Sequence, residues 1–446
     1  MRKTKGWFVC LFALVFFMGM VTAGFAAKQE AAPETQDTKT YFGHHVDGLE
    51  PVTIIYNSDS PNNTGGDASA MNFKALVEAE SKGKIKIDLH RFGSLYKQLD
   101  IPRTLPIGTI HFGNINKGLL MSRETGYGPW IIAYIWKSPE HLLSVVTSPE
   151  WYEMENELAK GKWNLKPLVN TTIGNWDYWS KTPMNSLKDF GGKKVWTYGE
   201  LASAYIGAWG GTPVMKSTGE MYMAYYKGTL NVISFTVAGY LSYKFFDAGK
   251  YWLHMPTYPP GAVGMHYNQD YMNLDKWKSL PTAYKKIILD ALDLLTWWGT
   301  WEGIQMEKLA AHRLINQHGV VDCGISTNYP EEYEKIKKAA VEAGKKYVFK
   351  RGVTQQQWDN AQAILEKYAD PKYNSKYSWY FKQAWAGADQ RLKDVEKKIK
   401  AGQSWDEACG VYEAKHRVNQ TAEEIKARCL SVPRIKWNWN YETRLQ

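Results

Sequence analysis

The stretch "VTIIYNSDSPNNTGGDASAMNFKALVEAESKGKIKIDLHRFGSL", residues 52–95, decides the fold class of this chain. It opens on a short apolar run, Val52 to Tyr56, that is typical of a buried strand and is followed by a loop rich in Ser, Asn, Pro and Gly. Apolar residues at helical spacing then predict a helix, and residues 84–89 alternate polar and apolar positions, which predicts a second strand. Strand, helix and strand in this order indicate a βαβ unit with a parallel sheet, and therefore an α/β fold.

The length of the chain predicts two lobes rather than one core. Its 446 residues are more than a single hydrophobic core comfortably serves. Residues 279–319 predict one or two long helices that begin at a cap on Ser279 and end at Gly319. Residues 330–346 predict a further amphipathic helix, and the remainder up to Gln446 is charged, aromatic and expected to be mostly helical.

The first 26 residues have the pattern of a secretory signal peptide. Three positive charges within residues 1–5 precede an apolar run that ends in the small residues Gly24 and Ala26. Cleavage is expected after Ala26, and residues 27–50 are expected to form a flexible mature N-terminus. An uncleaved membrane anchor is the alternative, because the apolar run nearly spans a bilayer. The pattern favours a cleaved, exported protein.

Charge and cysteine content narrow the class of partner. Lys and Arg number 55 against 45 Asp and Glu, a balance that favours anionic ligands in encounter but specifies none. Nucleic acid is not expected as a partner, because there is no basic cluster or repeat.

Cys409 and Cys429 lie close together in the helical tail and predict a disulfide, with two partly buried free thiols as the alternative. No spacing resembles a zinc site, and no cofactor is expected.

Aromatic residues are abundant, whereas catalytic signatures are missing. The chain has no GxSxG, HExxH, GxxxxGK[ST] or strand-linked GxGxxG motif, so an enzyme is the minority reading. It contains 20 Trp, 28 Tyr and 15 Phe. Two short strand-like segments place aromatic residues at alternate positions, which predicts that Trp176 and Tyr178 share one face, as do Trp196 and Tyr198.

Six segments between Phe73 and about Ala311 resemble, in the right order, the DctP-type solute-binding proteins of tripartite ATP-independent periplasmic (TRAP) transporters. They are "FKALVEAESKGKIKIDLHRFGSL", "LPIGTIHFGN", "SLKDFGGKKVW", "GTPVMKSTGEMYMAYYKGTLNVIS", "FFDAGKYW" and "YNQDYMNLDKWKSLP". The sequence departs from the family pattern at His111 and Asn231, where aspartate is usual. It also departs at Trp176 and Trp196, which fall where the family carries the arginines that clamp organic acids.

The resemblance implies a two-lobed α/β periplasmic-binding-protein fold with a ligand cleft between the lobes, crossing strands, a long bracing helix and a helical C-terminal extension. The expected division of the mature chain is residues 51–172 with about 258–290 for lobe 1, 173–257 with about 291–350 for lobe 2, and 351–446 for the C-terminal region.

The resemblance and the aromatic segments together imply a ligand site on the strand ends. The residues expected to line it are Tyr56, Arg91, Phe92, Trp176, Tyr178, Lys194, Trp196, Tyr198, Ser234, Phe235 and Asn268. An indole offers a flat apolar face in place of a guanidinium, which suits a ring, an alkyl group or a cation. An organic acid or another anion stays open, with Lys194, Arg91 or Lys181 as the source of positive charge.

The function implied is that of a periplasmic solute-binding protein. It would capture a small organic molecule and deliver it to the small and large membrane subunits of a TRAP-type transporter. The alternatives are a binding protein of another class, such as an ABC receptor or a sensor partner, a secreted enzyme on the same scaffold, and an exported adaptor that has lost its pocket.

Overall fold

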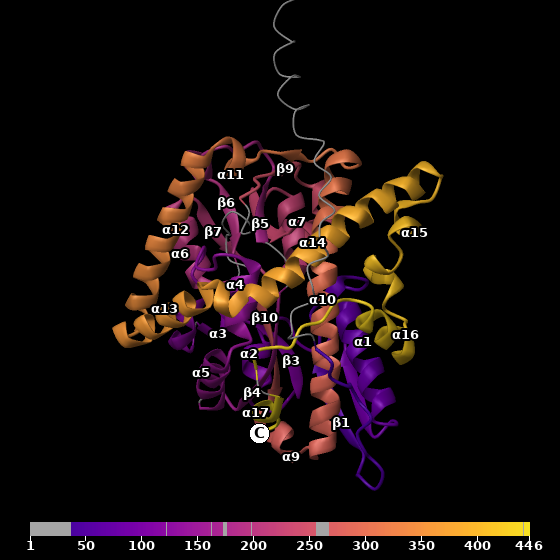
Figure 1. Ribbon diagram of the computed structural model, residues 1–446. Coiled ribbons are helices and arrows are strands. Elements are labelled where there is room, and N and C mark those ends of the chain that lie inside the picture. The colour runs from indigo at the N-terminus through magenta and orange to yellow at the C-terminus, as the bar shows by residue number, and fades with distance from the viewer. Residues whose placement is uncertain are drawn as a thin grey trace, which may run out of the picture.

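The computed structural model describes residues 37–121, 123–161, 163–172, 176–197, 199–255, 267–439 and 441–446. Two β-sheets lie one above the other, and helices surround both (Figure 1). The predicted signal peptide lies outside the described residues. Within them, no helix is both long enough and apolar enough to cross a membrane.

The first sheet contains the βαβ unit that the sequence predicted. Its strand order is β2-β1-β3-β10-β4, with β1 parallel to β2 and β3, and β10 antiparallel to β3 and β4. Ile85 and Ile87 of β2 are buried while Lys86 and Asp88 are exposed, as the alternation predicted. The strands are β1 (Val52–Asn57), β2 (Ile85–His90), β3 (Phe112–Asn116), β4 (Leu165–Thr172) and β10 (Tyr267–Asn273).

The second sheet has the order β11-β9-β5-β8-β6-β7 and includes the two aromatic segments as β5 and β6. Strand β6 is parallel to β7 and β8, whereas β5 is antiparallel to β8 and β9. The strands are β5 (Trp176–Ser180), β6 (Lys194–Thr197), β7 (Thr212–Met215), β8 (Val232–Thr236), β9 (Tyr251–Trp252) and β11 (Val321–Asp322).

The α-helices follow the strands in chain order, and short 3₁₀ helices connect several of them. The α-helices are α1 (Gly65–Glu80), α2 (Ile101–Thr104), α3 (Lys117–Met121), α4 (Pro139–Val146), α5 (Pro149–Lys160), α6 (Glu200–Ala208), α7 (Thr218–Tyr226), α8 (Val237–Ser242), α9 (Leu274–Ser279), α10 (Thr282–Asn316), α11 (Ile325–Asn328), α12 (Pro330–Lys350), α13 (Gln355–Ala369), α14 (Pro371–Lys400), α15 (Trp405–Cys409), α16 (Ala422–Leu430) and α17 (Tyr441–Leu445). The 3₁₀ helices are η1 (Thr125–Trp130), η2 (Leu187–Phe190), η3 (Phe245–Asp247), η4 (Gly410–Tyr412) and η5 (Ala414–His416).

Helix α10 is the predicted long helix, and it serves both sheets. Near its start it packs in the hydrophobic cluster of the first sheet, and near its end Ala310 and Leu314 pack in a cluster of the second. The helix begins at Thr282, so the predicted cap at Ser279 is wrong. Ser279 ends α9, and Leu280 is extended because the following residue is Pro281, which disfavours helical geometry before it.

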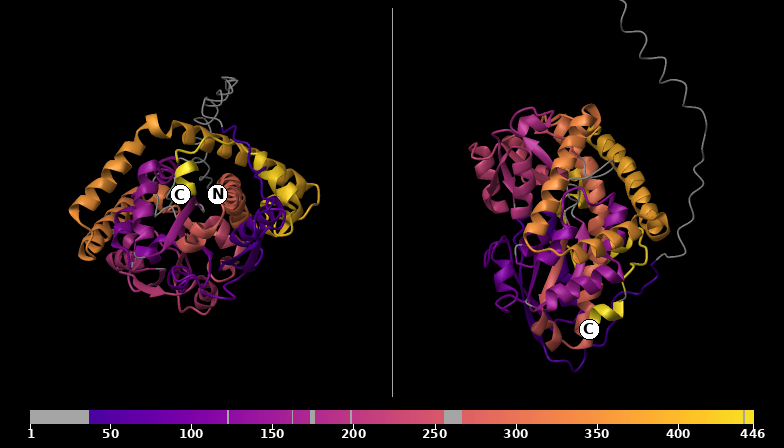
Figure 2. Two further views of the ribbon diagram at one scale, coloured as in Figure 1. Left: turned by 90° about the horizontal axis from the view of Figure 1, so that it is seen from below. Right: turned by 90° about the vertical axis from the view of Figure 1, so that its left-hand side faces the viewer.

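The C-terminal region is helical, as predicted, and curves round one side of the molecule (Figure 2). Helix α14 packs against α10 and α4, and α16 packs against α1 and α10. Cys409 and Cys429 are buried free thiols here, which corrects the predicted disulfide. Each packs in the main hydrophobic cluster, and burial raises the pKa of Cys409 to about 12 and that of Cys429 to about 11.

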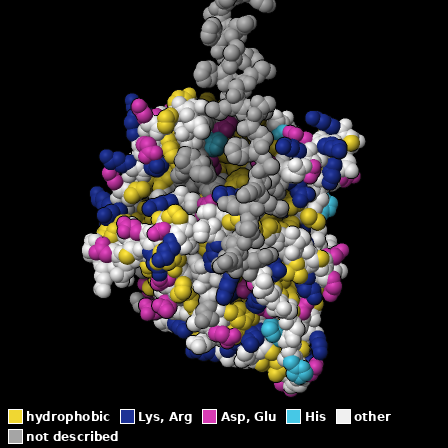
Figure 3. Space-filling model, viewed as in Figure 1, with side chains coloured by type: hydrophobic (Ala, Val, Ile, Leu, Met, Phe, Trp, Pro, Cys, Tyr) yellow, Lys and Arg dark blue, Asp and Glu magenta, His cyan; other side chains and the backbone are white. Residues whose placement is uncertain are grey.

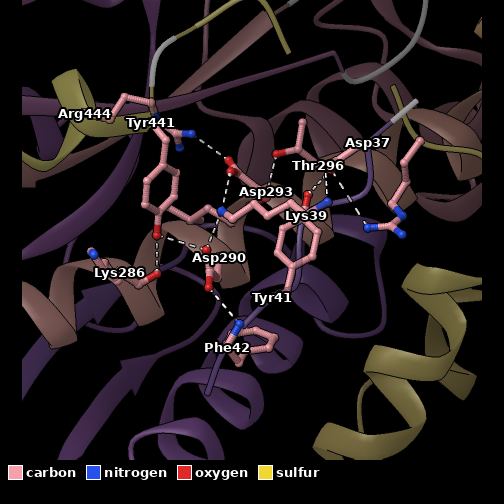
Figure 4. A network of polar contacts seen from close by, with 12 residues as sticks. Asp37, Lys39, Tyr41, Phe42, Lys286, Asp290, Asp293, Thr296, Tyr441 and Arg444 are labelled. Carbon is pink, nitrogen blue, oxygen red and sulfur yellow. Dashed lines mark hydrogen bonds and ion pairs between the residues drawn. The ribbon is translucent and has the colours of Figure 1, made fainter. Parts of the chain in front are cut away.

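The N-terminal segment from residue 37 onward is packed, whereas the sequence predicted residues 27–50 to be flexible. Val46 is completely buried and Phe42 nearly so, both in the cluster that contains the start of α10. Lys39 and Tyr441 reach the same carboxylate, Asp290 of α10, from opposite ends of the chain (Figure 4). Polar contacts to α10 therefore hold both ends of the described chain in place.

The strands of the first sheet fall within the residues expected for lobe 1, and those of the second sheet within the residues expected for lobe 2. On the face shown in Figure 3, Lys and Arg side chains are spread among Asp and Glu side chains.

Candidate ligand-binding site

The chain first passes from the first sheet to the second where several strand ends meet. Strand β4 ends at Thr172 in the first sheet, and β5 begins only four positions later, at Trp176, in the second. Thr172 pairs with the start of β10, and Trp176 pairs with Thr236 at the end of β8. Ligands of α/β proteins bind outside the carboxyl ends of strands where the chain changes direction, so this junction is the candidate site.

An aromatic cluster lies at the lobe 2 side of the junction. The rings of Trp176 and Trp196 stack with centroids 5.7 Å apart, and Phe235 lies 5.3 Å from Trp176. The indole Nε1 of Trp196 donates to the carbonyl oxygen of Lys216 at 2.9 Å. We call Trp176, Trp196 and Phe235 the aromatic wall.

The aromatic wall is less open than the sequence suggested. Trp176 is 9% exposed, Phe235 8% and Trp196 only 2%. The face of β6 that carries Trp196 was expected to be an exposed cleft wall, but Trp176 and the backbone at Lys216 cover the ring. Trp196 is therefore a packed side chain behind Trp176.

Tyr178 and Ser234, which pair with each other across β5 and β8, are both buried. The ring of Tyr178 makes edge contacts with Phe190 and Trp209 in a separate hydrophobic cluster. The predicted grouping of Trp176 with Tyr178 is thus wrong, because the two rings belong to different clusters.

On the lobe 1 side, Tyr56 reaches the junction at the end of β1. It is 8% exposed and packs edge-on against Phe73 and Phe112. Phe92 has a positive φ of 55° and is 54% exposed, on the loop after β2.

The cations that the sequence offered for an anionic ligand are engaged elsewhere or exposed. Arg91 donates to both carboxylate oxygens of the fully buried Asp67, each at 2.7 Å. Lys181 Nζ donates to the carbonyl oxygen of Tyr225 at 2.9 Å. Lys194 is exposed at the start of β6, the opposite end of the strand from Trp196.

The two remaining predicted site residues are Tyr198 and Asn268. Tyr198 lies outside the described residues. Asn268 pairs with Asn116 of β3 and Thr171 of β4 through the backbone of β10, so it lies at the junction.

Two carboxylates at the junction were missed by the sequence analysis. Asp59 lies just beyond the end of β1 and is half-buried, and Asp270 lies on β10 and accepts a hydrogen bond from Asn114 Nδ2 at 2.9 Å. Burial raises the pKa of each carboxyl to about 6. A position just after a parallel strand was the signal that could have found Asp59.

Tyr243 packs against the aromatic wall. Its ring lies 4.9 Å from that of Phe235, edge-on. Burial, and secondly the negative charge of Asp59, raise the pKa of Tyr243, while Asp270 and Asp59 add to the effect of burial in raising that of Tyr56. The charge of Asp59 in lobe 1 therefore acts on a ring of lobe 2 that packs against the aromatic wall.

Two of the departures from the family pattern have structural roles. The backbone N–H of Ile55 donates to His111 Nδ1 at 3.1 Å, and the N–H of Lys194 donates to Asn231 Oδ1 at 2.8 Å. Both side chains thus serve as acceptors for backbone donors. Within the described part of the chain, no group of three or more His, Cys, Asp or Glu side chains is arranged to hold a metal ion.

Two sheets, a chain that crosses between them and one long helix serving both make this a two-lobed solute-receptor architecture. The family model described as "Bacterial extracellular solute-binding protein, family 7" matches residues 57–350, more than half of the chain, and the protein belongs to this DctP family. It is accordingly a TRAP-type periplasmic solute-binding protein and not an enzyme.

Solved structures of TRAP periplasmic solute-binding proteins share the fold. One from Xanthobacter autotrophicus with bound β-D-galacturonate has a TM-score of 0.62 at 15% identity, covering 70% of this chain and 99% of that one. One from Desulfovibrio salexigens with bound orotic acid has a TM-score of 0.62 at 16% identity, covering 71% of this chain and 98% of that one. A Bordetella pertussis extracytoplasmic solute receptor binding pyroglutamic acid has a TM-score of 0.62 at 15% identity, covering 72% of this chain and 100% of that one.

A curated relative is the uncharacterized protein YiiZ of Salmonella typhimurium. It is 24% identical over 158 residues, which are 35% of this chain and 48% of that protein. The match thus spans about half the length of this relative. The family model ends at residue 350, so the C-terminal region from residue 351 lies beyond the matched part.

Proposed function

We propose that this chain is the extracytoplasmic receptor of a TRAP-type transporter. In this role it captures a small organic molecule at the junction of its two sheets and delivers it to the small and large membrane subunits. The observation that carries the proposal is the meeting of polar and aromatic side chains from both lobes where the chain crosses between the sheets. Asp59 and Tyr56 come from lobe 1, and Trp176 and Phe235 from lobe 2.

The ligands bound by the solved structures do not by themselves indicate the ligand of this chain. Galacturonate, orotic acid and pyroglutamic acid are all organic acids. Here the positions expected to hold acid-clamping arginines carry Trp176 and Trp196, and Arg91 is already paired with Asp67. The ligand is therefore to be sought among non-acids as well as acids.

A thermal-shift screen tests the proposal. Sets of acids, sulfonates, amines, polyols and aromatic compounds would each be added to the purified protein. A true ligand at a hundredfold excess over its Kd stabilises the folded state by about 2.7 kcal/mol, which a melting curve resolves. Stabilisation by none of the sets would contradict a receptor role and favour the adaptor reading.

Closure around the ligand provides a second test. Two lobes joined by crossing segments are expected to hinge together when a ligand binds. Small-angle scattering should therefore give a smaller radius of gyration with a confirmed ligand than without it. A receptor of another transport class would close in the same way, so the transporter class is tested separately, by whether the two TRAP membrane subunits are encoded beside this gene.

A further inference from the structure

We propose that the junction between the sheets takes a positively charged organic ligand, an amine or ammonium compound, bound between the carboxylates of Asp59 and Asp270 and the aromatic wall. This inference rests on the proposed function and names the chemical class of its ligand. It is argued from the charges, rings and hydroxyl groups that meet at the junction.

The carboxylates lack protein counter-charges. Among the described residues, no Lys, Arg or His forms an ion pair with Asp59 or Asp270, and Asp270 accepts its hydrogen bond from the neutral amide of Asn114. Removing a carboxylate from water without a cationic partner is costly, so such groups are retained where they act on something else. An organic cation supplies the missing charge.

The cations that directly follow two strands of the first sheet are already paired. Arg91, after β2, is held in a two-point ion pair with Asp67, and Lys117, after β3, is paired with Glu155. Among the residues that the structure describes, Asp59 and Asp270 have no such cationic partner.

The opposite side of the junction offers the surface that an organic cation prefers. Ring faces attract cations within about 6 Å of their centroids, and indole does so most strongly. Trp176 and Phe235 supply an indole and a phenyl ring in contact with each other, Trp196 stacks behind Trp176, and the ring of Tyr243 lies against Phe235. Carboxylate on one side and rings on the other is an arrangement that binds an ammonium and repels a carboxylate.

Tyr56 contributes a hydroxyl group on the lobe 1 side of the junction. Its side chain is more than nine-tenths buried and packs against Phe73 and Phe112, and the charges of Asp270, Asp59 and Asp67 act on it.

Matched pairs of probes test the charge of the ligand directly. Choline would be compared with its neutral isostere 3,3-dimethylbutan-1-ol, and 1,4-diaminobutane with 1,4-butanediol, with succinate and glucuronate as acids. A small-molecule bacterial extract, separated by ion exchange into cationic, neutral and anionic fractions, extends the comparison to the natural ligand. We expect the cationic fraction, and at least one cationic probe but not its isostere, to raise the melting temperature.

Variants assign the effect to the junction. Asp59→Asn and Asp270→Asn should each weaken binding of the stabilising cation about 10- to 100-fold, the scale of one charge-assisted contact. The matched control is Asp88→Asn, an exposed carboxylate on β2, which should leave affinity unchanged. The melting temperature of each ligand-free variant shows that the fold is intact.

The outcomes separate the inference from the proposed function. Stabilisation by the anionic or neutral fraction and not by the cationic one would overturn the inference and leave the receptor function standing. Stabilisation by no fraction would overturn both. A cation whose affinity is the same in Asp59→Asn, Asp270→Asn and Asp88→Asn would bind outside this junction and also overturn the inference.

Discussion

Two pairs of aspartates in this protein have opposite surroundings. Asp290 and Asp293 of α10 are surrounded by donors from both ends of the chain, as Figure 4 shows. Asp290 accepts from Lys39 Nζ at 2.6 Å, and Asp293 accepts from Arg444 Nη1 at 2.8 Å. Among the residues that the structure describes, Asp59 and Asp270, at the junction of the sheets, have no such cations.

The difference indicates which carboxylates hold the structure together. A buried charge that serves stability is compensated within the fold, because an uncompensated one costs several kcal/mol. The α10 pair meets this condition through the N-terminal segment and α17. The junction pair does not, which is the pattern expected where a protein keeps charge for a ligand.

The largest expected effect comes from breaking the compensated pair. Arg444 is completely buried and also donates to the carbonyl oxygen of Leu168 at 3.1 Å. Arg444→Met removes the hydrogen-bonded cation of buried Asp293, leaving only Lys39 Nζ at 3.8 Å among the described ion pairs, and should lower the free energy of unfolding by about 3–5 kcal/mol, measured by chemical denaturation. Arg351→Met, at a partly exposed arginine whose ion pair with Glu200 spans 3.8 Å, is the control and should cost less than about 1 kcal/mol. Equal losses of unfolding free energy in Arg444→Met and Arg351→Met would show that the buried ion pair on α10 contributes no more to stability than an exposed one.

Removing a ring from the aromatic wall should cost nearly as much. Trp196→Ala leaves a cavity behind Trp176 and removes the bond to Lys216, so the free energy of unfolding should fall by about 3–5 kcal/mol. Phe92→Ala, at a ring that is 54% exposed, is the control and should be close to neutral. An unchanged melting temperature together with lost ligand affinity would instead make Trp196 a direct ligand contact.

A smaller loss of stability is expected from removing one donor to Asp290, because several other donors to this carboxylate remain. Lys39→Met removes one donor to Asp290, but the backbone N–H of Phe42, His44 Nε2 and the Tyr441 hydroxyl remain within 3.0 Å. We expect a loss of about 1 kcal/mol in the free energy of unfolding. A loss as large as that of Arg444→Met would show that the remaining donors do not compensate Asp290.

The pH dependence of stability should show an effect of the reverse sign, because removing the charge of Asp59 should stabilise the protein at neutral and higher pH. The pKa of Asp59 is about 6 in the folded protein, above its ordinary value of 3.8. The folded state therefore binds a proton more tightly than the unfolded state, and the stability contributed by protonated Asp59 is present at low pH and lost as pH rises through 6. Asp59→Asn removes this dependence, so the variant should melt higher than the native protein at pH 8 and the difference should shrink towards pH 4.

Melting curves of the ligand-free proteins at several pH values check this expectation, with Asp88→Asn as the matched carboxylate. A difference that does not vary with pH would mean that Asp59 is compensated by a group that remains to be identified, and the contrast with Asp290 would disappear.

Local pattern allowed much of the fold to be predicted. The alternation in β2, the βαβ unit, the long helix α10 and the helical C-terminal region all follow from side-chain periodicity, and the structure confirms them. The candidate site was predicted less well. Trp176 and Phe235 do lie together at the junction, but Tyr178 packs in another cluster and Arg91 is bound to Asp67.

The sequence alone determined the class of this protein, because strand alternation, helix periodicity and the order of family segments are properties of neighbouring residues. Only the tertiary structure decided which charges are compensated. Lys39 and Asp290 are 251 positions apart, and Arg444 and Asp293 are 151 apart, so no local pattern indicates their pairing. The same holds for Asp59 and Asp270: a carboxylate without a partner is recognised only when the surroundings contributed by every other segment are known.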